Sequence, residues 1–404
     1  MSAGPSRRTV LPSVVVLLGL FVNPTLAQNV GSRPPAVEVT HQTGVDDPGL
    51  SPDAPSVAVA RTGEELYMEA CANCHGPDGT GAQANVVGLP IQPPDFTESR
   101  FASREPAADW AGVVTLGGPV RGFDRLMPAF GDALTRDEVD RILTYVQTLY
   151  EDKSWPRGEF NLPLALVTGK AFPEDEYYFR TTIGTDDAGS VMNKFVYEKR
   201  FGSQNQFEIV LPFGWRELSG PSGPSGEWAG GMGDAALALK RVLFHNLDMG
   251  TITSLTVEAI LPTGDESEGF GNGYTVFEPF LTWGQLLPVD AFFQVQTGVE
   301  LPTDSDAENE GLFRIALGRT FTAGGEWDRA ISPMVEFLGG GALEGGDPWA
   351  WDVMPEVHFT LNQRQHVMAN VGVRIPMTQT EGREPQIMFL VLWDWFDGGF
   401  FEGW

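Results

Sequence analysis

The stretch WAWDVMPEVHFTL, Trp349 to Leu361, alternates between two kinds of side chain. Its odd-numbered positions are apolar, whereas the even-numbered positions include Asp352, Glu356 and His358. Successive side chains of a β-strand point to opposite faces, so a period of two indicates a strand with one apolar and one polar face.

The same period recurs through the second half of the chain. It is seen in HVMANVGVRIPM (366–377), QFEIVLPFGW (206–215), TSLTVEAIL (253–261) and FFQVQTGVEL (292–301). About twelve such runs, separated by turns rich in Gly, Asp and Glu, lie between Tyr177 and Phe396. We therefore expect residues 176–404 to form an all-β antiparallel domain, a barrel of about twelve strands.

A two-faced strand set suits either a membrane barrel or a soluble β-domain. A barrel is favoured because its apolar face meets lipid and because aromatic side chains gather where strands leave the membrane. The tryptophans near predicted strand ends are Trp215, Trp283, Trp351, Trp393 and Trp395. The side chains predicted to face the lumen are Glu208, Glu258, Glu300, Glu356 and His358, with Lys240, Arg314 and Arg374 as their partners. We expect this ion-pair network to fill a narrow, plugged barrel rather than to line a solute pathway.

The N-terminus has the features of an export signal. Arg7 and Arg8 precede the mostly apolar stretch 10–22, and PTLAQ places small residues at a cleavage site. Residues 1–27 are therefore predicted to be a signal peptide, and residues 28–60, rich in Pro, Ser, Gly and Asp, a flexible linker. The formal net charge of −28 argues against nucleic acid as a partner. We expect an exported, periplasmic protein.

Residues 61–152, the helical unit, have a different pattern. TGEELYMEAC is helix-like, and LTRDEVDRILTYVQTLYED (134–152) has Thr135 as N-cap, Glu138 as its capping-box partner and apolar residues at helical spacing. Residues 153–175, which contain several prolines, are predicted to be a second linker.

The two cysteines of the chain lie in this unit, in CANCH (71–75). A zinc site needs four ligands, and no further cysteine exists to supply them. A thioredoxin-like redox pair calls for a βαβ context, which is missing here. Covalent attachment of haem fits best: Cys71 and Cys74 are the two thiols, and His75 follows directly as an iron ligand. We expect one haem c.

Two methionines of the helical unit are candidates for a sixth iron ligand. Met68 precedes Cys71 by one helical turn, on the side of the ring that His75 occupies, and cannot easily reach the other face. Met127 lies in an irregular stretch, RLMPAFGDALT, in which Pro128 discourages a helix. We predict that Met127 binds the iron, the alternative being a thioether that only packs in the core.

The stretches GEELYMEACANCHGPDGTG, PPDF and MPAFGDALTRDEVDRILTYVQTL together resemble a class I c-type cytochrome. The resemblance implies one-electron transfer, a crossing of first and last helices in which Gly63 and Tyr67 meet Tyr145, and a proline carbonyl, of Pro90 or Pro93, that orients the histidine. The stretches GGMGDAALALKRVLF and ILPTGDESEGFGNGYTVFEPFLTW are similar to an outer-membrane barrel family associated with phenol degradation. The final FDGGFFEGW (396–404) resembles the aromatic C-terminal signal of bacterial outer-membrane proteins.

These predictions combine into an electron carrier rather than a catalyst: a periplasmic haem unit tethered to outer-membrane lipid by its own barrel. Two alternatives stay open, a soluble periplasmic cytochrome whose β-domain binds a ligand or partner, and a haem subunit that feeds electrons to an oxidase. Residues 61–150 contain 13 acidic and 7 basic side chains and no lysine. We therefore expect redox partner proteins with basic docking surfaces.

Overall fold

The computed structural model describes residues 60–185, 189–220, 223–322, 328–346 and 348–394. The chain divides into two compact units, 1–57 and 58–404, and all described residues belong to the second. The predicted signal peptide, all but the last residue of the first linker, Trp395 and the C-terminal aromatic stretch lie outside the described residues. Within the described part of the chain, no helix has the length and apolar character needed to cross a membrane.

The N-terminal part of the second unit is helical. Its helices are α1 (Gly63–Ala70), α2 (Ala72–His75), α3 (Ala84–Val87), α4 (Ser99–Ala102), α5 (Ala107–Leu116) and α6 (Arg136–Leu149), followed and interrupted by the 3-10 helices η1 (Gly118–Arg121) and η2 (Gly158–Phe160). Capping boxes start both α1, at Thr62 with Glu65, and α6, at Thr135 with Glu138, as predicted for α6. One core cluster joins the two helices through Leu66, Ile142 and Val146.

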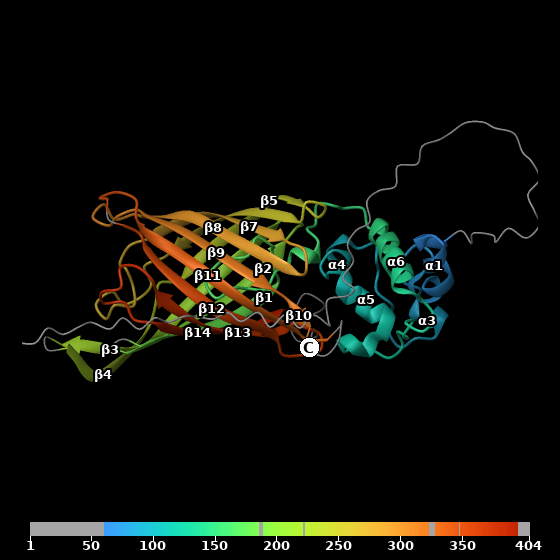
Figure 1. The fold of residues 1–404 in the computed structure, drawn as a ribbon, viewed down its shortest axis with the longest axis horizontal. Helices are drawn as coiled ribbons and strands as arrows, with labels where there is room; N and C mark the ends of the chain where they lie inside the picture. Colours follow the sequence, from blue (N-terminus) through green and yellow to red (C-terminus); the bar gives the residue numbers. More distant parts are fainter. Residues whose placement is uncertain (1–59, 186–188, 221–222, 323–327, 347, 395–404) are drawn as a thin grey trace, which may run out of the picture. The chain divides into compact units, whose positions relative to one another are not determined.

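The rest of the chain is a single antiparallel sheet (Figure 1). Its strands are β1 (Glu176–Gly184), β2 (Ser190–Phe201), β3 (Asn205–Gly220), β4 (Gly223–Met232), β5 (Ala236–Asn246), β6 (Thr251–Ile260), β7 (Val276–Leu286), β8 (Ala291–Pro302), β9 (Glu310–Arg319), β10 (Phe321–Thr322), β11 (Ala330–Ala342), β12 (Ala350–Thr360), β13 (Val367–Pro376) and β14 (Gln386–Asp394).

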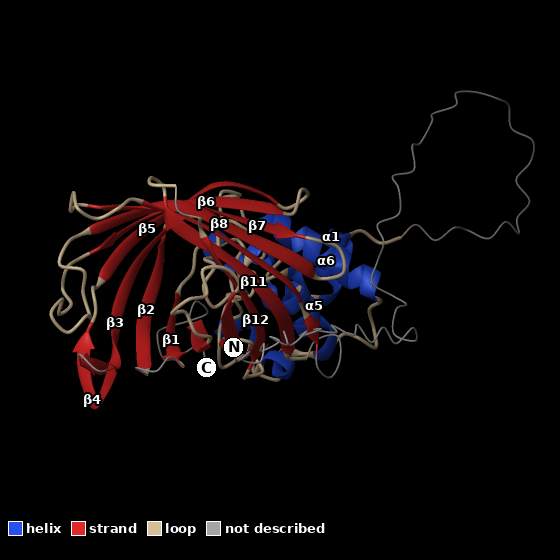
Figure 2. Ribbon diagram, turned by 60° about the vertical axis from the view of Figure 1, so that its left-hand side comes forward, coloured by secondary structure: helices blue, strands red, loops and turns tan. Residues whose placement is uncertain are grey.

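The sheet closes on itself. Each wall strand pairs with its neighbours in the chain, and β14 pairs with β1, with Glu176 opposite Asp394. Of the 14 strands, β4 pairs only with β3 and β10 only with β11, so 12 strands form the wall. Figure 2 shows these strands in red, curving around a common axis. The prediction of a barrel of about twelve antiparallel strands is confirmed.

The two faces of the wall have opposite character, as the alternation predicts. In β12, Asp352, Glu356 and His358 are buried, whereas Val357 is exposed. The buried polar wall residues also include Gln206, Lys240, Glu278, Gln294, Gln296, Glu336 and Asn370. The exposed apolar ones include Leu237, Leu239, Leu255, Leu281, Leu317, Val371, Val373, Ile387, Phe389 and Val391. This distribution is the inverse of a soluble β-domain, which buries its apolar face.

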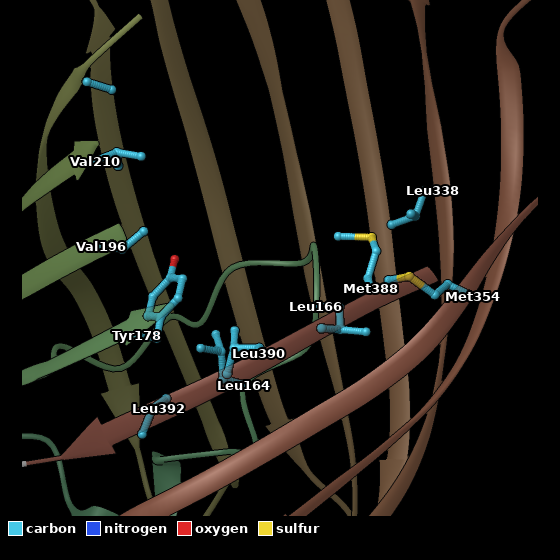
Figure 3. Close-up of a cluster of buried hydrophobic side chains, with 11 residues drawn as sticks. Leu164, Leu166, Tyr178, Val196, Val210, Leu338, Met354, Met388, Leu390 and Leu392 are labelled. Atoms are coloured by element: carbon cyan, nitrogen blue, oxygen red, sulfur yellow. The ribbon is translucent and has the colours of Figure 1, made fainter. Parts of the chain in front are cut away.

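Residues 161–175, which follow η2, fill the inside of the barrel, and we call this segment the plug. Leu164 and Leu166 pack in one cluster with Leu338, Met354 and Met388 of the wall. In Figure 3 the two leucines project from an irregular segment between wall strands. The second half of the segment predicted to be a linker thus lies inside the barrel, which accords with the expectation of a plugged lumen.

Candidate functional site

The CANCH stretch lies where α1 passes into α2. Helix α1 ends at Cys71, and α2 carries Cys74 and His75. Gly76 then takes φ +77°, a left-handed conformation that favours glycine, and this turns the chain away from the helix. The turn is held because the Tyr67 hydroxyl donates a hydrogen bond of 2.8 Å to the Gly76 carbonyl oxygen.

Both cysteines are free thiols, Cys71 half-buried and Cys74 exposed. Burial raises the pKa of Cys71 to about 11, and the neighbouring Cys74 adds to this rise. Cys71 is therefore protonated at neutral pH. The pair has the spacing and the accessibility that thioether attachment of a haem requires.

His75 has the features of an iron ligand. Burial lowers its pKa to about 4, so the imidazole is neutral, the form that binds metals. Its Nδ1 atom is buried and has no hydrogen-bond partner among the described residues. Its ring stacks on Phe96, with centroids 4.6 Å apart. Buried polar atoms are normally paired, so this orphaned nitrogen marks a site built for a group beyond the described side chains, and the donor set fits a haem.

Of the two prolines that the resemblance offered, Pro93 lies beside Gly81, but His75 Nδ1 has no hydrogen-bond partner in the described part of the chain, so the expected bond to a proline carbonyl is not formed. A side chain on Gly81 would lie only 2.5 Å from the Pro93 carbonyl oxygen. The Gly81 amide, in turn, donates to the His75 carbonyl oxygen at 2.9 Å. Pro90 is exposed.

Met127 lies in an irregular segment between η1 and α6, as predicted. Its side chain packs against a cluster formed by Ala111, Val114, Val139 and Leu143. Trp110 and Leu134 pack against this cluster. They also pack against the cluster around Leu66 and Ile142, which Cys71 contacts as well. Two shared side chains thus connect the surroundings of Cys71 and Met127. Met68, by contrast, is 45% exposed.

The predicted crossing of the first and last helices is confirmed. A side chain on Gly63 would lie 2.1 Å from the Arg141 carbonyl oxygen, so only glycine allows the two backbones to approach this closely. The Tyr67 and Tyr145 rings meet with centroids 5.3 Å apart. The crossing fixes Tyr67, which in turn holds the turn after His75.

Two aromatic residues near the site were not predicted as part of it. Phe96 stacks on His75 and also meets Trp110, with ring centroids 5.3 Å apart. The only signal in the sequence is PPDF, in which Phe96 stands two residues after a pair of prolines. These rings form an apolar wall beside the histidine.

The barrel lumen holds the second set of predicted residues. Glu336 accepts hydrogen bonds from the Val167 and Thr168 amides of the plug, at 3.0 and 2.6 Å. Glu356 accepts one from Leu166, at 3.0 Å. Further plug bonds run from Gly169 N to Gln296 Oε1, from Glu174 N to Gln206 Oε1, from Asn370 Nδ2 to Leu164 O and from Gln294 Nε2 to Pro163 O. The plug forms no helix or strand, so its backbone amides and carbonyls need partners elsewhere. Wall side chains provide these hydrogen bonds.

Not all predicted lumen residues bind the plug directly. Arg374 pairs with Asp352, with Nε and Oδ2 2.6 Å apart, and Asp352 also binds Arg383. These three residues line a pocket of about 200 Å³ with Gly184 and Gln386. The Arg314 guanidinium donates to Gln296 at 3.3 Å. The Lys240 Nζ atom donates to Gln206 Oε1 at 3.5 Å. The three predicted cations thus bind Gln206, Gln296 and Asp352 rather than the predicted glutamates, so the predicted pairing is wrong among the described residues.

Both parts of the chain match families of known proteins. Residues 58–146 match the family model described as cytochrome C oxidase, cbb3-type, subunit III, and residues 184–374 match the one described as putative MetA-pathway of phenol degradation. Both resemblances read from the sequence are therefore confirmed.

Solved structures similar to the barrel are outer-membrane proteins. The COG4313 outer membrane channel from Pseudomonas putida F1 is 11% identical, with a TM-score of 0.41 over 56% of this chain and 97% of that chain. The KdgM porin is 11% identical, with a TM-score of 0.35 over 55% and 99%, and the NanC porin is 7% identical, with a TM-score of 0.35 over 54% and 98%. These likenesses concern the fold alone. A search of curated proteins found no match.

Proposed function

We propose that this protein is a c-type cytochrome that carries electrons and is anchored in the outer membrane by its own barrel. One haem would be attached through Cys71 and Cys74, and His75 and Met127 would bind its iron. The observation that carries the proposal is the half-buried, neutral His75 directly behind two free thiols, with its Nδ1 buried and unpaired among the described residues. Bound haem would supply an iron that changes its charge by one electron.

The residues around the site would bind and shield this group. The thiols would hold it, and His75 and Met127 would raise its potential, because paired His and Met ligation favours the reduced iron. Phe96 and Trp110 exclude water from one side of the histidine.

The polarity of the barrel supports its insertion in the outer membrane. The wall exposes apolar side chains such as Leu239 and Val371 and buries polar ones, which is stable only where lipid covers the outside. Aromatic pairs lie near both ends of the wall, Tyr177 with Trp393 at one and Phe313 with Trp351 at the other. Such girdles are typical of the two membrane interfaces.

The lengths of the connections support an orientation. At the end where β1 begins, three connections have only three or four residues each. They are 202–204 between β2 and β3, 247–250 between β5 and β6, and 287–290 between β7 and β8. At the other end, 261–275 and 377–385 are far longer. Outer-membrane barrels have short turns on the periplasmic side, so β1 begins there and the haem unit that precedes it is periplasmic.

The plug argues for an anchor rather than a channel. Its backbone is bound by wall side chains from several strands, and its leucines fill the lumen. A solute would have to displace these contacts. We therefore assign the barrel the role of a tether.

A second candidate function is the delivery of electrons to an oxidase, as a haem subunit of a larger complex. It is favoured by the match of residues 58–146 to the family of cytochrome C oxidase, cbb3-type, subunit III. Stable co-purification with a catalytic subunit after detergent extraction would support this candidate over a carrier that meets its partners transiently.

The main proposal is tested by a double variant, Cys71→Ala with Cys74→Ala. We expect the wild type to show a haem-stained band at full length after denaturation, in the detergent-extracted outer-membrane fraction, and the variant to lose the stain. Met68→Ala, a change at an exposed position of α1, is the control and should keep it. Haem that stays bound to the denatured double variant would overturn the attachment. A wild type found in the soluble periplasmic fraction would overturn the tether.

A further inference from the structure

Four carboxylates lie together on the inner face of the barrel, at the end where the first strand begins. Glu176 of β1 lies opposite Asp394 of β14 on one side and opposite Glu198 of β2 on the other. Glu174, the second-last residue of the plug, completes the group. The exposure of each of the four side chains is 5% or less. They therefore surround the seam at which the barrel closes.

Lys170 of the plug forms ion pairs with only two of these four carboxylates, Glu174 and Glu176. Its Nζ atom lies 2.5 Å from Glu174 Oε1 and 3.4 Å from Glu176 Oε2. The remaining oxygens, Glu174 Oε2, Glu176 Oε1 and Asp394 Oδ1, have no hydrogen-bond partner among the described residues. One carboxylate oxygen from each of these three residues lies within 4.8 Å of the others.

A second observation comes from Glu198, which is not one of these three. It is 5% exposed, and its Oε2 atom is also without a hydrogen-bond partner in the described part of the chain. It faces the lumen beside Glu176, and its charge acts on Glu174 and on Glu176. A further unpaired oxygen thus belongs to a buried side chain that lies next to Glu176 across the β1–β2 pairing.

The charges do not balance. When all are ionised, the four carboxylates carry −4, and Lys170 in contact with them carries +1. Lys240, which acts on Glu174 and Glu176 from further away, adds another +1. Arg200 also acts on Glu174, but its guanidinium lies over the Trp155 ring at 4.5 Å and donates to the Ser203 carbonyl oxygen. Uncompensated buried charge and unpaired buried oxygens are both costly.

We propose that this group, Glu174, Glu176, Glu198 and Asp394, binds a divalent cation of the hard type, Ca²⁺ or Mg²⁺. All of the available donors are oxygens, which such cations prefer over the softer transition metals. A bound cation would neutralise the surplus charge and occupy the unpaired oxygens. It would also join the plug, the first two strands and the last strand at the barrel seam. This inference is independent of the haem.

The test uses the full-length, haem-loaded protein in detergent, stripped of metal with a chelator and titrated with Ca²⁺, Mg²⁺ and Mn²⁺ by calorimetry. We expect one ion per chain, with affinity reduced at least tenfold in Asp394→Asn. The matched control is Glu258→Gln, which changes a lumen carboxylate outside the group. It should bind the cation as the wild type does, and it accounts for cations carried by residual lipid. Glu198→Gln is a second variant in case Asp394→Asn does not insert.

A second readout is thermal: the wild-type barrel should lose its compact, heat-modifiable gel form at a higher temperature with Ca²⁺ than with chelator, and Asp394→Asn should show no such shift. Equal metal content and equal thermal behaviour in the wild type and both variants would overturn the site and would indicate that protons neutralise the carboxylates instead. A haem-free Cys71→Ala, Cys74→Ala protein that still binds the cation would separate this result from the fate of the proposed electron transfer.

Discussion

At the scale of single residues, the two methionines of the helical unit have different surroundings. Met68 is largely exposed on α1, whereas Met127 packs beside Val114 and Leu143. Only the second is held in place by its neighbours. A ligand that is already held loses less side-chain freedom when it binds.

We expect Met127→Ala to retain the covalent haem and to lower its reduction potential, because a thioether ligand favours the reduced iron. The variant should also bind added imidazole or cyanide, which the wild type should resist. A spectroelectrochemical titration measures the first effect and ligand-difference spectra the second. Met68→Ala is the control. If Met127→Ala kept the wild-type potential, another residue would have to be the sixth ligand.

Gly63 is the residue on which the helix crossing depends. Gly63→Ala would place a methyl group about where the Arg141 carbonyl oxygen lies, so α1 must shift away from α6. We expect a loss of about 1–3 kcal/mol in the stability of the helical unit, the usual cost of overpacking. Denaturant unfolding followed by haem absorbance measures it. Glu64→Ala, at the next and exposed position, should change stability by less than about 0.5 kcal/mol. Equal effects of the two changes would contradict the role of the crossing.

At the scale of elements, the two faces of a wall strand differ in whether they tolerate a charged side chain. Val371→Arg places a charge on the outer face of β13, where Val371 is exposed. In a membrane this should cost about 2–4 kcal/mol near mid-depth and reduce insertion. Val371→Leu should insert normally. Heat-modifiable migration of the outer-membrane fraction reports the outcome, and full insertion of Val371→Arg would show that this face does not meet lipid.

The plug depends on Glu336, which is fully buried and accepts from Val167 and Thr168. Glu336→Ala leaves these amides unpaired, at a cost of about 1–3 kcal/mol each. We therefore expect cleavage by added protease within 161–175 and measurable ion conductance in planar bilayers. Glu336→Gln keeps one acceptor oxygen and should give a smaller effect. If the wild type conducts ions as well as Glu336→Ala does, the plug does not close the lumen.

The sequence allowed the strands to be predicted because lipid and lumen impose opposite polarity on alternate residues, as at Glu356 and Val357. The plug could not be predicted in the same way. Its backbone is paired by side chains more than 100 residues away, such as Gln296 and Glu336, so no local period marks it. One signal was available: NLPLALV (161–167) is too apolar for an exposed linker.

The CANCH sequence could be predicted to attach haem because thioether attachment needs both thiols and the histidine within five residues. Phe96 and Trp110 come from distant loops and helices, and only the folded chain brings them to His75. The carboxylate group at the seam was hidden for a similar reason: Glu176 and Asp394 stand at opposite ends of the barrel sequence, and closure makes them neighbours.

At the scale of the whole molecule, we expect charge to govern the encounter with the proposed redox partners. The excess of acidic over basic side chains in residues 61–150 should attract basic partners. We expect the rate of electron transfer from a basic donor to fall as salt is added, since the Debye length is about 8 Å at physiological ionic strength and shortens further above it. Stopped-flow kinetics with one basic and one acidic donor gives the test. A rate that rises with salt for the basic donor would contradict the prediction.

The plug enters and leaves the lumen at the same end of the barrel. Before it, the Ser154 hydroxyl binds Ser203 in the turn between β2 and β3, and after it Glu176 begins β1 at that same end. The plug is thus a loop that enters the lumen from one end of the barrel, and neither end of the chain has to pass through the lumen. The barrel can consequently close in the membrane first and take up its plug afterwards, so assembly needs no fixed order between haem attachment outside the wall and filling of its interior.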